Sequence, residues 1–225
     1  MSLAENLRLA HAAYNHTEAV VHVGADNRPD DMAKAAVELA RREAEAGTLG
    51  KVLPVFFGPA PQLNEELVNK QRDEKIRPAA LGEPVPRLKQ VIAANIVETS
   101  GIGRCGEQSA VAFSYLLEFA EGTPFGVATI IGGNHQFVLI GVEGHKVRGY
   151  YPLASAPIWP SDAVILDCWA KLYFPVAPFW PTEIPKILAQ TRPGYAKPTV
   201  ELKPLIFHKN PIRSKFKVNR LYEPR

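Results

Sequence analysis

The sequence has little cysteine, with only Cys105 and Cys168 among its 225 residues. Two thiols are too few for the disulfide framework on which small secreted domains depend, so we expect a reducing compartment. A bridge between the two is possible on paper, but it would block any reaction that uses either thiol.

The sequence also lacks an apolar run that approaches the roughly 20 residues of a membrane-spanning helix. Its first residues show neither the basic nor the apolar region of a signal peptide. We therefore expect a cytoplasmic protein without a membrane span, and secretion without a cleaved signal peptide stays open as an alternative.

A charge excess of one sign is missing as well. The 26 Lys and Arg residues nearly balance the 23 Asp and Glu residues, which leaves a net charge of +3. This excess is too small to indicate a nucleic-acid partner, and the basic residues from Lys203 onward are explained by a solvated tail. The hydrophobic fraction of 46% and the charged fraction of 22% are those of an ordinary globular protein.

Proline divides the chain. Prolines at 78, 84 and 86 mark a connector between a helical N-terminal region, residues 1–86, and a mixed region, residues 87–197. Residues 198–225 have the pattern of a polar tail, and the prolines before it indicate a segment rich in loops. Helices are expected over residues 3–22, 29–46, 62–76 and 86–98, with a short apolar run at 52–57.

A glycine-rich loop runs into Cys105, and an almost wholly apolar segment follows it to Ala120. The segment is long enough for a helix and too apolar for a surface helix, which predicts a buried central helix. Cys105 then lies at the helix N-terminus, where free N–H groups and the helix dipole favour the reactive thiolate. Glycines at 101, 103 and 106 let another part of the chain approach closely.

After the central helix the apolar pattern takes the period of strands. Turns that contain glycine separate the first of them. The fold class is therefore α+β, with the cysteine-bearing helix packed on an antiparallel meander. The expected strands cover residues 127–131, 135–140, 147–151 and 163–167.

Three side chains stand out in chain order: Cys105 at a helix start, His135 at a strand start and Asp167 at a strand end. Nucleophilic acyl transfer needs a thiolate, an imidazole that exchanges its proton, and a group that orients the imidazole. Because side chains alternate along a strand, His135 and Asp167 can stand side by side if their strands are neighbours, both pointing at the central helix. The backbone N–H of Cys105 is then a natural oxyanion donor.

The motifs Gly-x-Cys-Gly-Glu-x-Ser, Asn-His-x-Phe-Val-x-Ile and Val-Ile-Leu-Asp-x-Trp, in this order, resemble the papain-like/transglutaminase-like Cys-His-Asp superfamily. The resemblance covers about residues 95–170. It implies that Cys105 is the nucleophile, His135 the general base and acid, and Asp167 the orienting carboxylate. Trp169 resembles the aromatic residue that often follows the aspartate. Bacterial members include peptidases, deamidases and secreted effectors, so action inside a host cell is a second possible location.

The interval between His135 and Asp167 is longer than the hairpin spacing usual in that superfamily. An insertion over residues 143–162 would account for it, and leaves Asp162 as a rival for the third role. No oxyanion-hole side chain can be assigned, since Gln90 and Asn95 have no motif behind them. The residues considered for a substrate cleft are Gly106, Asn134, Tyr150, Tyr151, Trp159 and Trp169.

Each residue of the trio also has a purely structural explanation. Cys105 could be an inert core thiol, His135 a hydrogen-bonded strand histidine, and Asp167 a cap of the turn at Cys168. Glu107 is expected to serve the first turn of the central helix, and Cys168 to be a core thiol.

The sequence predicts a cysteine-dependent hydrolase or acyl transferase. A thioester on Cys105 would form from a peptide bond or a glutamine side-chain amide of a protein or peptide substrate, in a protease, deamidase or transglutaminase. The alternatives are a non-catalytic protein-binding module on the same fold and an arylamine-type acyltransferase. This chemistry implies no metal or organic cofactor. A metal site at His11, His16 and His22 is not expected either, because these residues do not share a helical face.

Overall fold

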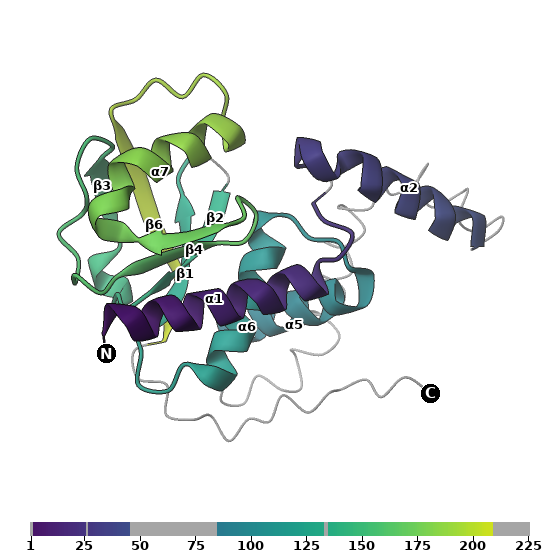
Figure 1. Cartoon of the computed structure of the whole chain (residues 1–225), viewed down its shortest axis with the longest axis horizontal. Coiled ribbons are helices and arrows are strands. Elements are labelled where there is room, and N and C mark those ends of the chain that lie inside the picture. The colour runs from purple at the N-terminus through teal and green to yellow at the C-terminus, as the bar shows by residue number, and fades with distance from the viewer. Residues whose placement is uncertain (1, 26, 46–84, 133–134, 209–225) are drawn as a thin grey trace.

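The computed structural model describes residues 2–25, 27–45, 85–132 and 135–208. Within these ranges the chain is a mixed α+β structure of five helices and a curled, six-stranded antiparallel sheet (Figure 1). The apolar run at 52–57, the helix expected over 62–76 and the cleft candidate Asn134 lie outside the described residues. No helix in the described ranges is long and apolar enough to cross a membrane.

The first four helices begin and end close to the positions that the sequence indicates, whereas the fifth lies in a segment where loops are expected. The helices are α1 (Leu3–Val20), α2 (Pro29–Glu45), α5 (Val85–Ser100), α6 (Cys105–Phe119) and α7 (Val176–Thr191), with a short 3-10 helix at Gly144–Lys146. The strands are β1 (Phe125–Ile130), β2 (His135–Ile140), β3 (Gly149–Pro152), β4 (Val164–Asp167), β5 (Leu172–Pro175) and β6 (Thr199–His208).

The sheet has the order β3-β6-β1-β2-β4-β5, and every neighbouring pair is antiparallel. This order departs from the expected meander in one respect. The chain carries β3 to the far edge, and β6 then returns to fill the place between β3 and β1. The strands β2 and β4 are consequently interior and adjacent, which is the condition for their end residues to meet.

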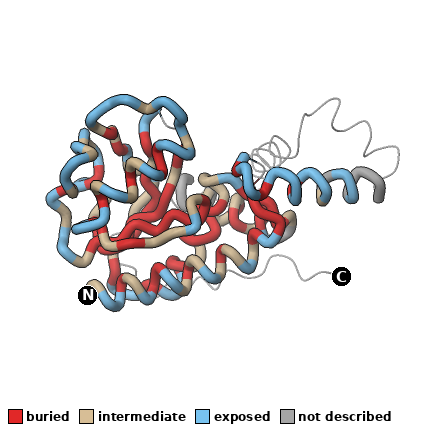
Figure 2. Tube along the Cα trace, turned by 45° about the horizontal axis from the view of Figure 1, so that its top comes forward, coloured by how far each residue is buried: buried red, intermediate tan, exposed pale blue. Residues whose placement is uncertain are grey.

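Helices cover both faces of the sheet. On one face Phe137, Leu139 and Ile165 pack with Trp180 and Ile184 of α7. On the other face the core contains Val138, Ile140 and Leu166 with residues of α1 and α6. Because β2 and β4 are buried on both faces, their sequences are almost continuously apolar. Figure 2 shows the buried residues of the chain in red in its interior.

The helix α6 is the buried central helix that the sequence predicts. Its side chains from Gln108 to Phe113 are all buried, and it packs against α1, α5 and β2. Glu107 serves its first turn as expected, since its Oε2 accepts the backbone N–H of Arg104 at 2.6 Å. In contrast, α2 projects from the rest of the described chain and is largely exposed (Figures 1 and 2).

The C-terminal part of the described chain differs from the expectation. The polar tail expected from residue 198 begins instead with β6, whose Val200 and Leu202 are buried between β1 and β3. The alternation of Val200 and Leu202 with polar residues is the pattern of a strand, and Pro204 is accommodated beside a register shift in the pairing with β1.

The loop-rich segment expected after residue 175 is in fact the helix α7. Pro181 and Pro185 lie inside it, although each removes a backbone donor. The apolar residues Trp180, Ile184 and Ile187 recur at helical spacing and are fully buried. Their burial on the sheet outweighs the cost of the prolines.

Candidate active site

The end of the sheet at which β2 begins and β4 ends holds a buried polar pair. The strands pair with Val138 opposite Leu166, which places His135 and Asp167 diagonally on one face. His135 Nε2 lies 2.5 Å from Asp167 Oδ2, and the two side chains are 1% and 0% exposed. Asp167 Oδ1 also accepts the N–H of Ala170 at 2.9 Å. The carboxylate therefore caps the turn, as one explanation held, and contacts the imidazole as well.

The prediction that His135 and Asp167 share a face is confirmed, but the prediction that this face is turned to the central helix is wrong. By strand alternation they share the face of Phe137 and Ile165, which α7 covers, whereas α6 packs on the opposite face. His135 is the first residue of β2, so it lies at the end of the sheet and is not enclosed between strand and helix. From there its ring can reach the N-terminus of α6.

Cys105 is the first residue of α6 and is only partly buried. A hydrogen bond joins its side chain to the His135 imidazole. Since Nε2 of the ring is taken by Asp167, Nδ1 is the nitrogen left for the sulfur. The structure thus brings Cys105, His135 and Asp167 into one hydrogen-bonded line.

The surroundings of His135 favour its charged form. Burial by itself lowers the pKa of His135, but the charge and hydrogen bond of Asp167, followed by the hydrogen bond and charge of Cys105, outweigh it and raise the pKa to about 10. The imidazole is therefore an imidazolium at neutral pH, able to stabilise a neighbouring thiolate and to donate a proton later.

The loop before Cys105 is held by the segment that connects α1 to α2. Gly101 has a φ of +70°, and a side chain there would overlap the His22 ring. The N–H of Val23 donates to Gly101 O at 3.0 Å, and Gly24 forms a parallel bridge with Ile102. The close approach expected at the glycines is thus made by a segment of the N-terminal region.

Trp169 covers the imidazole. Its ring lies edge-on to His135 with centroids 5.5 Å apart and an interplanar angle of 67°. Trp169 is 4% exposed. It shields the His135–Asp167 pair from water, which strengthens the pair.

Gln136 is a residue that the sequence analysis missed. A Cβ at Gly106 would lie 3.1 Å from its Oε1, so the absence of a side chain at Gly106 lets the carboxamide lie against the first turn of α6. Strand alternation gives the signal that could have found it, because the neighbour of His135 must face the side of the sheet on which α6 packs.

Two other candidates lie elsewhere. Asp162 does not replace Asp167, because its carbonyl and carboxylate contact Asn6 of α1 at 2.7 and 3.4 Å. Trp159 packs edge-on against Tyr151 and Trp180, in the aromatic cluster under α7. The insertion thus builds the core of the α7 face.

Cys168 is the expected core thiol. It is 3% exposed and packs with residues of α1 and α6. Burial raises its pKa far above the usual value, and Asp167 adds to the effect. Both cysteines are free, so the bridge that was possible on paper does not form.

The described residues contain no group of three or more His, Cys, Asp and Glu side chains that could hold a metal ion. The chain matches no protein-family model, no curated protein and no solved structure. What the site can do must therefore be argued from its own geometry.

Proposed function

We propose that the protein is a cysteine-dependent enzyme that transfers an acyl group from a peptide bond or a glutamine side-chain amide to Cys105, and then to water or an amine. The observation that carries the proposal is the line of hydrogen bonds from a partly exposed thiol at a helix start through a buried imidazole to a buried carboxylate. The substrate would be a protein or a peptide, and the core would be of the papain-like/transglutaminase-like type that the motifs suggest.

The chemistry follows from the three side chains. The Cys105 thiolate attacks the carbonyl carbon, and the carbon–oxygen π electrons move to the oxygen to give a tetrahedral oxyanion. When the intermediate collapses, the carbon–nitrogen bond breaks and His135 gives its proton to the leaving amine. A thioester remains on Cys105. Water or a second amine then attacks the thioester and gives a proton to His135. The bond between the carbonyl carbon and sulfur breaks, and the thiolate is restored.

The oxyanion needs hydrogen-bond donors at the start of α6. The backbone N–H of Cys105 is one in this proposal, because it lies at the N-terminus of α6 beside the attacking sulfur. The carboxamide of Gln136, which lies beside Gly106, is the second donor in this proposal. Asp167 holds the ring through Nε2 and stabilises the imidazolium.

The proposal is tested by alkylation with iodoacetamide at pH 7, followed by mass spectrometry of the peptides that contain Cys105 and Cys168. We expect fast, selective labelling of Cys105 and a loss of roughly a hundredfold in His135→Ala. His145→Ala, which removes a histidine whose side chain is 66% exposed, is the matched control and should label as the wild type does.

Slow labelling of both cysteines at similar rates would reject the proposal in favour of a non-catalytic binding module. If labelling is selective, incubation with acetyl-CoA tests the acyltransferase alternative through an acetyl adduct on Cys105. Peptides and glutamine-containing proteins then distinguish hydrolysis, deamidation and transamidation.

A further inference from the structure

Trp169 is fixed by the segment that connects α1 to α2. Its Nε1 donates to Asn27 Oδ1 at 2.9 Å, and its backbone carbonyl accepts from Arg28 Nη1 at 2.7 Å. Arg28 Nη2 also pairs with Asp31 Oδ2, which accepts the N–H of Ala25 at 2.8 Å. Both the side chain and the main chain of Trp169 are thus held from a part of the sequence more than a hundred residues away.

We propose that Asn27, Arg28 and Asp31 are positioning residues of the candidate active site, which hold the Trp169 indole against the His135 ring. This inference rests on the proposed function, because it assigns a role in keeping His135 dry and correctly oriented. The three residues touch neither the substrate nor the reacting atoms, and act through Trp169.

The burial of Arg28 and Asp31 argues against an incidental contact between Arg28 and the main chain of Trp169. Arg28 is 8% exposed and Asp31 is 7% exposed. Removing two opposite charges from water carries a desolvation cost, which good geometry and further hydrogen bonds must offset. Here those further hydrogen bonds go to the main chain of Trp169 and of Ala25. The ion pair therefore fixes the turn that follows Asp167, which Asp167 Oδ1 holds from its other side.

The same segment holds the other side of the site. Residues 23 and 24 lie along residues 101–103, which come just before Cys105. The N–H of Val23 donates to the carbonyl of Gly101 at 3.0 Å, and the N–H of Gly103 donates to the carbonyl of Gly24 at 3.2 Å. One connector thus contacts the chain that precedes the nucleophile and the chain that follows the carboxylate. The N-terminal region thereby has a place in the function.

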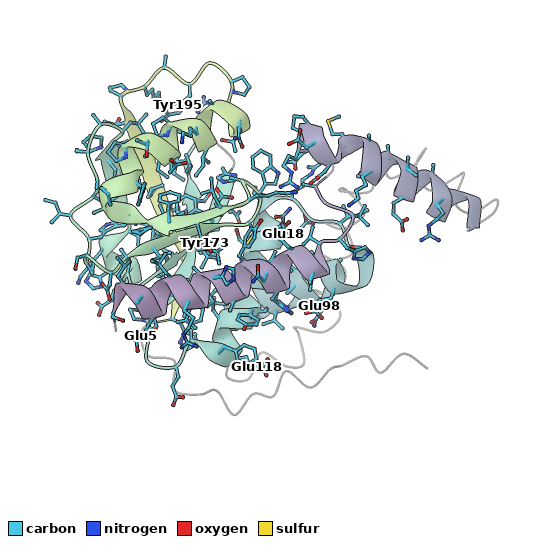
Figure 3. The ribbon with its side chains drawn as sticks, viewed as in Figure 1. Glu5, Glu18, Glu98, Glu118, Tyr173 and Tyr195 are labelled. Atoms are coloured by element: carbon cyan, nitrogen blue, oxygen red, sulfur yellow. The ribbon has the colours of Figure 1, made fainter. Side chains whose placement is uncertain are left out.

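The charges around Arg28 indicate that its effect is geometric. Arg28 is paired with Asp31, and the adjoining cavity of about 140 Å³ is lined also by Glu18, Lys34 and Lys171. Oε2 of Glu18, a residue of α1 that Figure 3 labels, lies 4.0 Å from Nζ of Lys171. Lys34 Nζ donates to the carbonyl of His22 at 3.1 Å. Each of the two carboxylates lies close to a cation here, so we infer that the segment acts on the site chiefly by placing Trp169.

The test measures the rate of Cys105 alkylation by iodoacetamide as a function of pH in the full chain. Asn27→Leu removes the acceptor for Trp169 Nε1, while Asn27→Asp keeps one. We expect Asn27→Leu to lower the rate at pH 7 by roughly tenfold through displacement of the ring, and to move the profile towards that of an ordinary thiol. Asn27→Asp should restore most of the rate. Arg28→Met should act as Asn27→Leu does.

Two further variants separate positioning from simple loss of stability. Trp169→Phe lacks the N–H, so adding Asn27→Leu to it should lower the rate no further. Arg41→Leu breaks the ion pair of Arg41 with Glu38 on α2. Its partners are three residues apart, as Arg28 and Asp31 are, but the Arg41 side chain is solvent-exposed. Arg41→Leu should leave the profile unchanged. Thermal unfolding of every variant reports stability separately.

The outcomes distinguish this inference from the proposed function. If wild-type Cys105 is labelled selectively and Asn27→Leu and Arg28→Met lose stability while they keep the wild-type pH profile, the segment is only structural and the inference fails. If wild-type labelling is not selective, the proposed function fails first and the positioning role fails with it.

Discussion

The two cysteines of this chain both lie near the carboxylate of Asp167 and have different surroundings. Cys168 follows Asp167 directly, is buried among apolar side chains, and has its pKa raised by burial and by the charge of Asp167. Cys105 is partly exposed and meets Asp167 only through His135, which that carboxylate keeps protonated. The carboxylate thus adds to the effect of burial on the Cys168 thiol, and at Cys105 it acts on the imidazole that contacts the sulfur. We therefore expect the two thiols to differ in reactivity, because Cys105 is partly exposed with an imidazolium beside it and Cys168 is buried without a cation.

The largest effect on this contrast is expected from Asp167→Asn. The amide keeps the shape and the acceptor for Ala170, but removes the larger of the two negative charges that act on the buried His135. We expect Cys105 to lose most of its advantage over Cys168 in alkylation at pH 7, and the free energy of unfolding to fall by about 3 kcal/mol. Iodoacetamide labelling and urea unfolding measure the two. Asp162→Asn is the control, and an unchanged ratio of labelling rates in Asp167→Asn would contradict the role given to the carboxylate.

Gln136→Leu sharpens the contrast, because it should distinguish the nucleophilicity of Cys105 from stabilisation of the oxyanion in acyl transfer. Alkylation passes through no oxyanion, so the iodoacetamide rate at Cys105 should stay as in the wild type. Acylation by p-nitrophenyl acetate does pass through one, and its burst rate should fall about a hundredfold. Gly106→Ala should act in the same direction, since its Cβ would lie 3.1 Å from Gln136 Oε1. Equal losses in both reactions would show that Gln136 supports the thiolate and not the oxyanion.

The pH dependence of stability reports the protonation of His135. Its pKa is raised from 6.5 to about 10, so the folded protein holds a proton that the unfolded chain releases between these values. The stabilisation is fully present below pH 6.5 and is lost as the pH rises towards 10. We expect the free energy of unfolding to fall by about 1 kcal/mol per pH unit between pH 7 and 9 from this group. Urea midpoints should show this slope in the wild type, and a flat profile shared by His135→Gln and the wild type would contradict it.

The central helix and the strands that carry the trio could be predicted from sequence because local patterns determine them. The apolar segment after Cys105 is too long and too uniform for a surface helix, and the near-continuous apolar runs before Ile140 and Asp167 belong to strands covered on both faces. Alternation along these strands was enough to put His135 and Asp167 on one face. It could not show which helix covers that face, because that helix is α7, and the prolines in its sequence indicate loops.

Other parts of the site depend on contacts that no local pattern contains. The hydrogen bond between Asn27 and Trp169 joins segments far apart in the sequence, and neither residue type predicts the other. The strand β6 was missed because its polar residues alternate with a few apolar ones beside a basic tail, and its partners β1 and β3 are not its neighbours in sequence. Tertiary pairing decided both features.

The smallest effect is expected from Cys168→Ala, which removes the buried thiol of the comparison. Removal of one buried sulfur leaves a small cavity and should cost about 1 kcal/mol in urea unfolding. Because the pKa of Cys168 is raised, the folded protein keeps its proton above the pH at which the unfolded chain loses it. The wild type should therefore lose additional stability above about pH 9, and Cys168→Ala should not. Labelling of Cys105 should be unchanged, since Cys168 lies in the apolar core under α1 and takes no part in the hydrogen bonds from the sulfur to Asp167. A fall in Cys105 labelling in this variant would mean that Cys168 affects Cys105 through the turn that follows Asp167, and that the two thiols do not behave independently.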